Sequence, residues 1–360
     1  MSQAARDTIG AATAEAIAGG AIRLPAGSSS RKGKAFVKGR TRWIVLTVVI
    51  AAVLVVAVWV MLRHFRRDAG ALLELLPPDA DAVAVLDLDL LQSNPAVKKL
   101  LAEPSNAALS PEYQQLLAQT GFRFQDDLRQ LAAAKLGPDW VGTARVDVDR
   151  PRFLSYLKSQ GALQSDLAGR TVYSFGSERP FRLAFLEDRL VAFGVGADPG
   201  NLTRLVDRYA NRSGGSAKDE LGRSGLLERY PAGSGLWFVG RTERLFESDP
   251  AGPSLGPFQF GKDWWQGSRI VTASVVSSPL HLDIHLESQC DNAASAERMA
   301  NAFRAVLAIL RAVPPSQDVS KGPDYAPLLA AVAIRQAEAS VFIDWHWDAS
   351  MLAMLAEGTR

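Results

Sequence analysis

The chain has 360 residues, with 40 Lys and Arg against 38 Asp and Glu, which gives a net charge of +2. The charge is uneven: residues 1–67 hold eleven Lys or Arg and two acids, a net +9, which leaves 29 against 36, a net −7, for residues 68–360. The acidic remainder argues against nucleic-acid binding, and the single cysteine, Cys290, excludes an intrachain disulfide.

Residues 1–42 are rich in Ala, Gly and Ser and offer few side chains that a folded core could bury. We expect a disordered, basic cytoplasmic tail, with a docking peptide for a cytoplasmic partner as the alternative. Topology and anionic lipid explain its positive charge better than a polynucleotide partner does.

Residues 43–62 contain one polar side chain, Thr47. Twenty residues of α-helix rise about 30 Å, the thickness of a bilayer's hydrocarbon core. A lone strand could not satisfy its backbone groups in lipid, so a transmembrane helix is predicted. The residues that we expect at the membrane interface are Trp43, Trp59, Arg40, Arg42, Arg63, Arg66 and Arg67.

Six Lys or Arg lie between residues 31 and 42, and only three follow the span, between residues 63 and 67. Because Lys and Arg are retained on the cytoplasmic side, the N-terminus is predicted inside. The apolar run is too long for a cleaved signal peptide and ends in charged rather than small residues. We predict an uncleaved single-pass anchor in a bacterial inner membrane, with the C-terminal domain periplasmic or extracellular.

Residues 63–81 form a predicted juxtamembrane segment that ends at Pro77 and Pro78. Residues 82–210 form the first half of the outer domain. Its predicted strands lie at 82–89, 143–148, 171–175, 181–186 and 190–195, the last two joined as a hairpin. Its helices are predicted to open at Asn94-Pro95, Ser110-Pro111 and Asp198-Pro199.

Residues 211–226 are a predicted linker, and residues 227–360 form a second half of similar plan. The predicted elements are a strand at 236–239, a hairpin of 269–277 with 280–287, an amphipathic helix that ends before Pro314, a helix at 325–332, a strand at 339–347 and a helix at 349–357. This mixture predicts an α+β fold with a largely antiparallel sheet. An internal duplication would explain the similar plans, although residue identity between the halves is too low to prove it.

The anchor, the segment Pro78-Asp-Ala-Asp-Ala-Val-Ala-Val-Leu-Asp-Leu-Asp and the strand and helix at 280–310 resemble uncharacterised bacterial single-span, membrane-anchored ectodomains. The resemblance covers most of residues 43–360 and is one of pattern, without a catalytic signature. It implies an envelope location and assigns no functional residue.

Two pairs of acids, Asp87/Asp89 and Asp147/Asp149, each lie on one face of a predicted strand. They could act in acid–base chemistry or hold a hard cation. We expect instead that the second Asp of each pair ends its strand and helps to start the next helix.

Histidines and acids alternate along two predicted strands, as His281-x-Asp283-x-His285 and as Asp344-x-His346-x-Asp348. Alternation places each set on one face of its strand. If the strands are neighbours, the candidate zinc ligands are His281, Asp283, His285 and His346. His281 and His285 lie about 13 Å apart along one strand, so the second strand must contribute. The alternative is an ordinary solvated face with no cofactor.

No residue spacing supplies the convergent groups of a catalytic site, and one span cannot form a transport path alone. We predict a non-catalytic, membrane-tethered protein whose outer domain binds or scaffolds another envelope component, with an envelope protein as the expected partner. The alternatives are a domain that binds lipid or another apolar ligand and a metal-dependent hydrolase that uses the His/Asp cluster.

Overall fold

A computed structural model of the chain describes residues 70–102, 111–176, 179–211, 214–247, 254–255, 258–259, 262–312 and 326–358. These residues all belong to one compact unit. The predicted tail, the predicted span at 43–62 and the seven predicted interface residues lie outside these ranges. No helix within the described ranges is both long enough and apolar enough to cross a bilayer.

The described chain is built on a twelve-stranded sheet in which every neighbouring pair is antiparallel, which confirms the predicted α+β class. The strand order is β13-β14-β12-β11-β8-β1-β2-β3-β7-β6-β5-β4, and β9 pairs with β10 separately. The strands are β1 (Ala82–Asp87), β2 (Leu128–Leu136), β3 (Asp139–Val146), β4 (Leu163–Leu167), β5 (Arg170–Phe175), β6 (Phe181–Glu187), β7 (Leu190–Val195), β8 (Ser234–Arg241), β9 (Ser254–Leu255), β10 (Phe258–Gln259), β11 (Ser268–Ser277), β12 (His281–Cys290), β13 (Val332–Ala337) and β14 (Ser340–Asp348).

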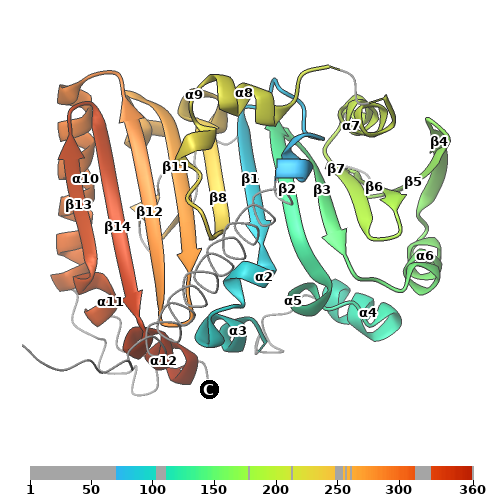
Figure 1. The fold of residues 1–360 in the computed structure, drawn as a ribbon, viewed down its shortest axis with the longest axis horizontal. Coiled ribbons are helices and arrows are strands. Elements are labelled where there is room, and N and C mark those ends of the chain that lie inside the picture. The colour runs from blue at the N-terminus through green and yellow to red at the C-terminus, as the bar shows by residue number, and fades with distance from the viewer. Residues whose placement is uncertain are drawn as a thin grey trace, which may run out of the picture. The chain divides into compact units, whose positions relative to one another are not determined.

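Helices lie on both faces of the sheet and at its lower end in Figure 1. They are α2 (Leu88–Leu91), α3 (Pro95–Ala102), α4 (Pro111–Thr120), α5 (Phe124–Asp127), α6 (Arg150–Ser159), α7 (Pro199–Asn211), α8 (Ala217–Arg223), α9 (Thr242–Leu245), α10 (Ala293–Ala312), α11 (Ala326–Ala330) and α12 (Ala349–Gly358), with 3₁₀ turns η2 (Leu227–Arg229) and η3 (Lys262–Trp265). Residues 70–73 are also helical.

The two halves of the chain repeat one strand order. In the first half the neighbours run β1-β2-β3-β7-β6, and α6 follows the β2–β3 hairpin. In the second half they run β8-β11-β12-β14-β13, and α10 follows the β11–β12 hairpin. The equivalent strands β1 and β8 pair antiparallel at the centre, where Figure 1 shows them side by side. The first half adds β5 and β4 at its outer edge.

Alternation along the strands separates two faces, which we call face 1 and face 2. The register joins Val83, Val239 and Thr272 on face 1, and Ala84, Phe238 and Ala273 on face 2. On face 1, residues of segment 70–76, α7 and α8 pack over the first half in the largest core cluster; they include Leu72, Leu73, Leu76, Leu202, Leu205, Val206, Ala217 and Leu221. On face 2, α6 and α10 each cover one half through Leu157 and Met299.

The predicted linker at 211–226 contains helix α8. Ser216 caps this helix, because its hydroxyl accepts from the backbone N–H of Asp219 while the Asp219 carboxylate accepts from the backbone N–H of Ser216. Ala217 and Leu221 are buried, and the Ala217 N–H donates to the Leu76 carbonyl at 2.9 Å. This segment therefore fastens the start of the described chain to the sheet.

Several sequence predictions are confirmed: the β6–β7 and β11–β12 hairpins, α7 starting at Pro199, and α10 ending at Ala312. The predicted helix at 325–332 ends at Ala330, and the chain then enters β13. Strand β2 was not predicted, because its central Ala132, Ala133 and Ala134 have low strand propensity. Their small side chains are buried in the middle of the sheet, so packing outweighs propensity.

Two glycines with opposite surroundings test the packing of the sheet. A Cβ on Gly142 would lie 2.5 Å from the Ala132 carbonyl oxygen and 2.5 Å from the Phe193 ring, whereas a Cβ on Gly222 in α8 would meet nothing within 4 Å. We expect Gly142→Ala to destabilise the fold by about 1–3 kcal/mol through overpacking. Gly222→Ala should stabilise it by about 0.5–1 kcal/mol through helix propensity.

The measurement is the thermal unfolding midpoint of the full-length protein in detergent. Equal midpoints for the two variants, or a higher midpoint for Gly142→Ala, would contradict the close approach of β2, β3 and β7.

Candidate functional site

The two strands that carry alternating histidines and acids are neighbours. In the antiparallel β12–β14 pair, Asp283 lies opposite His346, and His285 lies opposite Asp344. The register continues from Trp237 through Ser274 to His285, so these side chains share face 1 with the main core. We call the set His281, Asp283, His285, Asp344 and His346 the His–Asp ladder.

Asp283 lies between two imidazoles. Its Oδ1 is 2.5 Å from His346 Nδ1, and its Oδ2 is 3.2 Å from His281 Nε2. The ring centroids of His281 and His346 are 5.5 Å apart. The His346 side chain is 61% exposed and the Asp283 side chain 25% exposed, so this end of the ladder opens to solvent.

His285 belongs to a second cluster with Asp344. His285 Nδ1 is 2.9 Å from Asp344 Oδ1, while Arg335 from β13 binds Asp344 Oδ2 through Nη2 at 2.7 Å and Nε at 3.0 Å. Although burial opposes ionisation, the hydrogen bonds from His285 and Arg335 hold the pKa of Asp344 below its ordinary value.

The ladder therefore brings three of the four predicted zinc ligands together, His281, Asp283 and His346, and places His285 beside Asp344. Across the described parts of the chain, no three His, Cys, Asp or Glu side chains are grouped so that they could hold one metal ion. The His346 imidazole is hydrogen-bonded to the Asp283 carboxylate, and the His281 imidazole lies 3.2 Å from it. Zinc binding by these residues stays a prediction.

Ser278 extends the ladder in a way that the sequence did not reveal. Its Oγ is 2.9 Å from His281 Nδ1, which completes a Ser278–His281–Asp283 chain. The same oxygen accepts from the backbone N–H of His281 at 3.1 Å and lies 3.2 Å from the His281 carbonyl. These contacts belong to the β11–β12 turn, so the hydroxyl serves turn geometry rather than nucleophilic attack.

The paired acids act as caps and ion-pair partners. Asp149 caps α6 as predicted, but α2 is capped by Asp87 rather than Asp89. Asp89 and Asp147 both bind Arg129, at 3.0 and 2.9 Å. The hydrogen bond to Asp147, followed by that to Asp89, raises the pKa of the Arg129 guanidinium.

Arg129 lies in the wall of a cleft of about 1390 Å³ on face 1, which sequence reasoning did not find. The cleft lies between residues 71–75, the end of α7, the start of α8 and strands of the first half. The arginines that line it among the described residues are Arg129, Arg145, Arg170, Arg189 and Arg208. The acids that line it are Glu74, Asp89, Asp147, Glu187 and Asp219. We call this the arginine cleft.

Each acid of the arginine cleft already has a partner. Asp89 and Asp147 bind Arg129, and Arg189 Nε lies 3.2 Å from Asp147 Oδ1. The Tyr209 hydroxyl donates to Glu187 Oε1 at 2.6 Å. Glu74 is paired with Lys218, and Asp219 accepts from Ser216, a hydrogen bond that lowers the Asp219 pKa.

Two of the arginines are held differently. Arg170 donates from Nη1 to the carbonyls of Phe185 at 3.1 Å and Leu186 at 2.5 Å, and its Cζ lies 4.9 Å from the centroid of the Tyr209 ring. Arg208 Nη1 donates to the Gly214 carbonyl at 3.4 Å, and its buried Nε has no partner among the described residues. Burial lowers the pKa of Arg208. Within the described chain, neither guanidinium is in ion-pair contact with a carboxylate.

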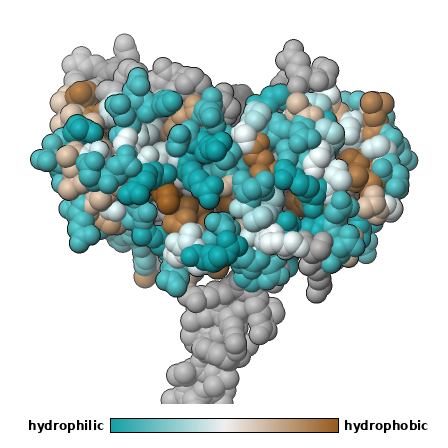
Figure 2. All heavy atoms as spheres, turned by 90° about the horizontal axis from the view of Figure 1, so that it is seen from above, coloured by the Kyte–Doolittle hydropathy of each residue, from teal (hydrophilic) through white to brown (hydrophobic). Residues whose placement is uncertain are grey.

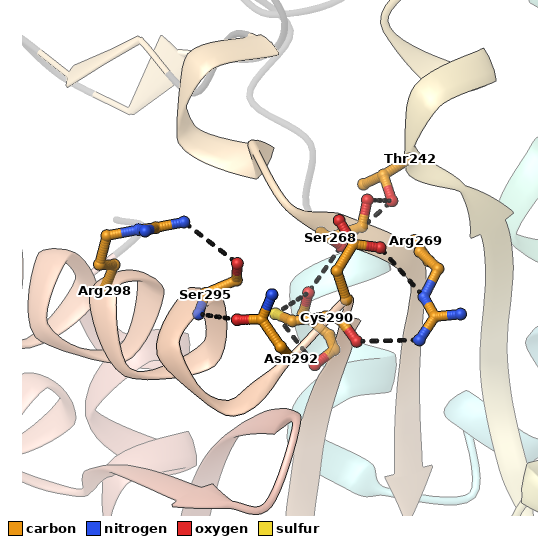
Figure 3. A network of polar contacts seen from close by, with 9 residues as sticks. Thr242, Ser268, Arg269, Cys290, Asn292, Ser295 and Arg298 are labelled. Carbon is orange, nitrogen blue, oxygen red and sulfur yellow. Dashed lines mark hydrogen bonds and ion pairs between the residues drawn. The ribbon is translucent and has the colours of Figure 1, made fainter.

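Cys290 lies in a buried polar network that joins β11, β12 and the residues after β8 (Figure 3). Ser268 Oγ is 2.7 Å from Ser288 Oγ, and the Thr242 hydroxyl donates to the Ser268 carbonyl at 2.7 Å. The cysteine is 1% exposed, and burial raises the pKa of its thiol. This network is structural, and the thiol is closed to solvent-borne reagents.

No protein family and no curated protein matches the sequence. Among solved structures, crystal form I of TP0453 is similar over 80% of this chain and 97% of that chain, with 10% sequence identity and a TM-score of 0.44. Crystal form III of TP0453 covers 79% of this chain and 97% of its own, with the same identity and TM-score.

The Asp344 contacts predict a pH-dependent stability. A carboxylate whose pKa is lowered in the folded state adds stability at pH values above its ordinary pKa of about 4, and that stability is lost as the pH falls through the folded value. We expect Asp344→Asn to cost about 0.5–1 kcal/mol at pH 7, and the difference from the wild type to shrink below about pH 4.

Thermal unfolding of the full-length protein between pH 3 and pH 7 measures this effect. Asp188→Asn is the matched control, because the Asp188 side chain is 97% exposed and 3.5 Å from Arg150. If Asp344→Asn lowers the stability by the same amount at every pH, the ion pair is not the cause of the loss.

Proposed function

We propose that this chain is a non-catalytic, membrane-tethered protein of the bacterial envelope whose outer domain binds another envelope component through the arginine cleft. The apolar segment at 43–62 and the charge asymmetry around it support the membrane tether, and the fold of the following residues supports the outer domain. One observation carries it: residues 71–75, which begin nine residues after the predicted span, form part of the wall of a large cleft.

Chain length limits how far this cleft lies from the bilayer. The predicted span ends at Leu62, and Gly70 follows eight residues later. A fully extended chain reaches at most about 3.6 Å per residue, so Gly70 lies within about 29 Å of the membrane boundary. Ala71, Leu72, Glu74 and Leu75 line the cleft, and this short separation from the predicted span supports a cleft near the membrane.

The chemistry of the cleft favours recognition over catalysis. Its acids are engaged by arginines, by Lys218, by Tyr209 and by Ser216, so they hold the walls in place. No His or Cys is among the described residues that line it. Tethering then raises the effective concentration of this surface for partners in or near the bilayer.

The surface around the upper end of the sheet agrees with a polar partner. Seen from above in Figure 2, the described surface is mostly hydrophilic, with small hydrophobic patches separated by polar residues. No broad apolar area for an obligate protein interface is visible among the described residues in this view.

We also propose that the domain arose by internal duplication. The repeated five-strand order, the helix after each first hairpin and the antiparallel pairing of β1 with β8 support this origin. After duplication, each half kept its strand order but acquired a different surface on face 1: a covered core and cleft in the first half, and the His–Asp ladder in the second.

The topology is tested with single cysteines in a Cys290→Ser background. Ala35→Cys lies in the predicted tail, and Gly215→Cys lies on an exposed segment where a Cβ meets only Pro78, at 3.9 Å. In intact spheroplasts, a membrane-impermeant maleimide should label position 215 and should reach position 35 only after permeabilisation. Labelling of position 35 alone would overturn the predicted orientation.

Binding through the cleft is tested by site-specific photocrosslinking in intact cells. A photoreactive phenylalanine analogue at Ala210, an exposed residue of the cleft, should give a reproducible adduct with an envelope component. The matched control places it at Leu163 on the edge strand β4, which is 75% exposed. The proposed binding role is wrong if Ala210 and Leu163 give the same adducts, or if Ala210 gives none.

A further inference from the structure

We propose that the arginine cleft takes an anionic phosphate group, with Arg170 and Arg208 as the residues that bind it. The inference rests on the proposed binding function and names the chemistry of the ligand. The phosphate can belong to the headgroup of an anionic phospholipid or to a free phosphate, and the experiment below separates these two sources.

The pairing of charges in the cleft singles out these two arginines. All five lining acids are engaged, and Arg129 and Arg189 are compensated by Asp89 and Asp147. Arg170 and Arg208 are bound by backbone carbonyls, which carry no charge. Arg145, the fifth arginine of the lining, has an interaction of its own. At Arg170 and Arg208, by contrast, no carboxylate of the described chain is in ion-pair contact with the guanidinium.

Arg208 has the stronger reason to bind an anion. A buried N–H without an acceptor costs free energy, and a partly desolvated cation costs more unless it is paired. The Arg208 Nε has no acceptor among the residues that the structure describes. A phosphate oxygen would supply both the acceptor and the negative charge, and the planar guanidinium can bind two such oxygens at once.

Arg170 is held in place before any ligand arrives. Two carbonyls of β6 fix one of its nitrogens, and the Tyr209 ring lies beneath its guanidinium. Tyr209 is in turn held by its hydrogen bond to Glu187. A rigid donor loses little conformational entropy when it binds, so such a site favours affinity.

The location of the cleft favours a lipid headgroup as the source of the phosphate. The cleft wall includes residues 71–75, which follow the predicted span within the reach of a short chain. Ala71, Leu75 and Leu190 add apolar wall next to the arginines. A headgroup whose acyl chains remain in the bilayer would meet both kinds of surface.

The test is calorimetry of the full-length protein in a non-ionic detergent with three probes. These are dihexanoyl phosphatidylglycerol, dihexanoyl phosphatidylcholine and inorganic phosphate. We expect saturable binding of phosphatidylglycerol and weak binding of phosphatidylcholine. Phosphate that binds as tightly as phosphatidylglycerol identifies a free anion as the ligand, whereas binding of phosphatidylglycerol alone identifies the headgroup.

The variants are Arg170→Gln and Arg208→Gln, with Arg223→Gln as the matched control. Arg223 lies on α8 outside the cleft lining, pairs with Glu220 and has a side chain that is 68% exposed. Each cleft variant should weaken binding of the anionic probe about tenfold, the loss expected for one charge-assisted contact, and Arg223→Gln should not change it. Arg208→Gln should unfold at the wild-type temperature or above it, because it removes a partly desolvated charge that no carboxylate of the described chain contacts.

The inference is overturned if the folded wild type binds neither phosphatidylglycerol nor phosphate, if phosphatidylcholine binds as tightly as phosphatidylglycerol, or if both cleft variants bind as the wild type does. If calorimetry detects no binding but photocrosslinking still gives a protein adduct specific to Ala210, only the phosphate ligand is ruled out and the proposed binding function stands. If phosphatidylglycerol binds saturably but cysteine labelling shows the domain on the cytoplasmic side, the proposed location is wrong and the proposed ligand stands.

Discussion

The antiparallel pairing of β1 with β8 is the contact on which the rest of the fold depends. It places Val83 opposite Val239 and Val85 opposite Trp237, and it merges two five-strand arrangements into one sheet. Trp237 is 1% exposed, and the Tyr230 ring packs against it with centroids 5.2 Å apart. Burial, together with Asp87, raises the Tyr230 pKa to about 12. Without this pairing, each half would expose an edge strand.

One continuous sheet makes both candidate sites share a face. Over the first half, segment 70–76, α7 and α8 cover face 1, and the arginine cleft forms where their polar ends meet the strands. In the second half, the same face carries the solvent-exposed His–Asp ladder. In the ladder, Asp283 and Asp344 each contact a histidine, whereas in the cleft no carboxylate of the described chain contacts Arg170 or Arg208. The two sites on this face therefore differ in how their charged side chains are paired.

An arginine that is partly removed from water and has no ion pair lowers the free energy of unfolding of its domain. Functional sites commonly retain such costs, because the same group stabilises the bound state. The neighbouring acids show the contrast: the Asp89–Arg129–Asp147 arrangement and the Asp219–Ser216 cap fix local structure. The cleft therefore combines a wall of paired charges with two arginines that no carboxylate of the described chain contacts.

The sequence by itself determined the apolar segment, the charge asymmetry, the β6–β7 and β11–β12 hairpins, most of the described helices, and the alternation that put the ladder on one strand face, because these follow from local periodicity and from turn and cap residues. It missed β2, because Ala132–Ala134 have low strand propensity. These alanines form a strand in the folded chain because their small side chains pack between the neighbouring strands and the side chains that cover the sheet. It also missed the arginine cleft. Arg129, Arg170 and Arg208 come from β2, β5 and α7, and only the strand order brings such distant segments to one cavity. Which arginine has a carboxylate partner is likewise decided by distances in the folded chain, which no local pattern encodes.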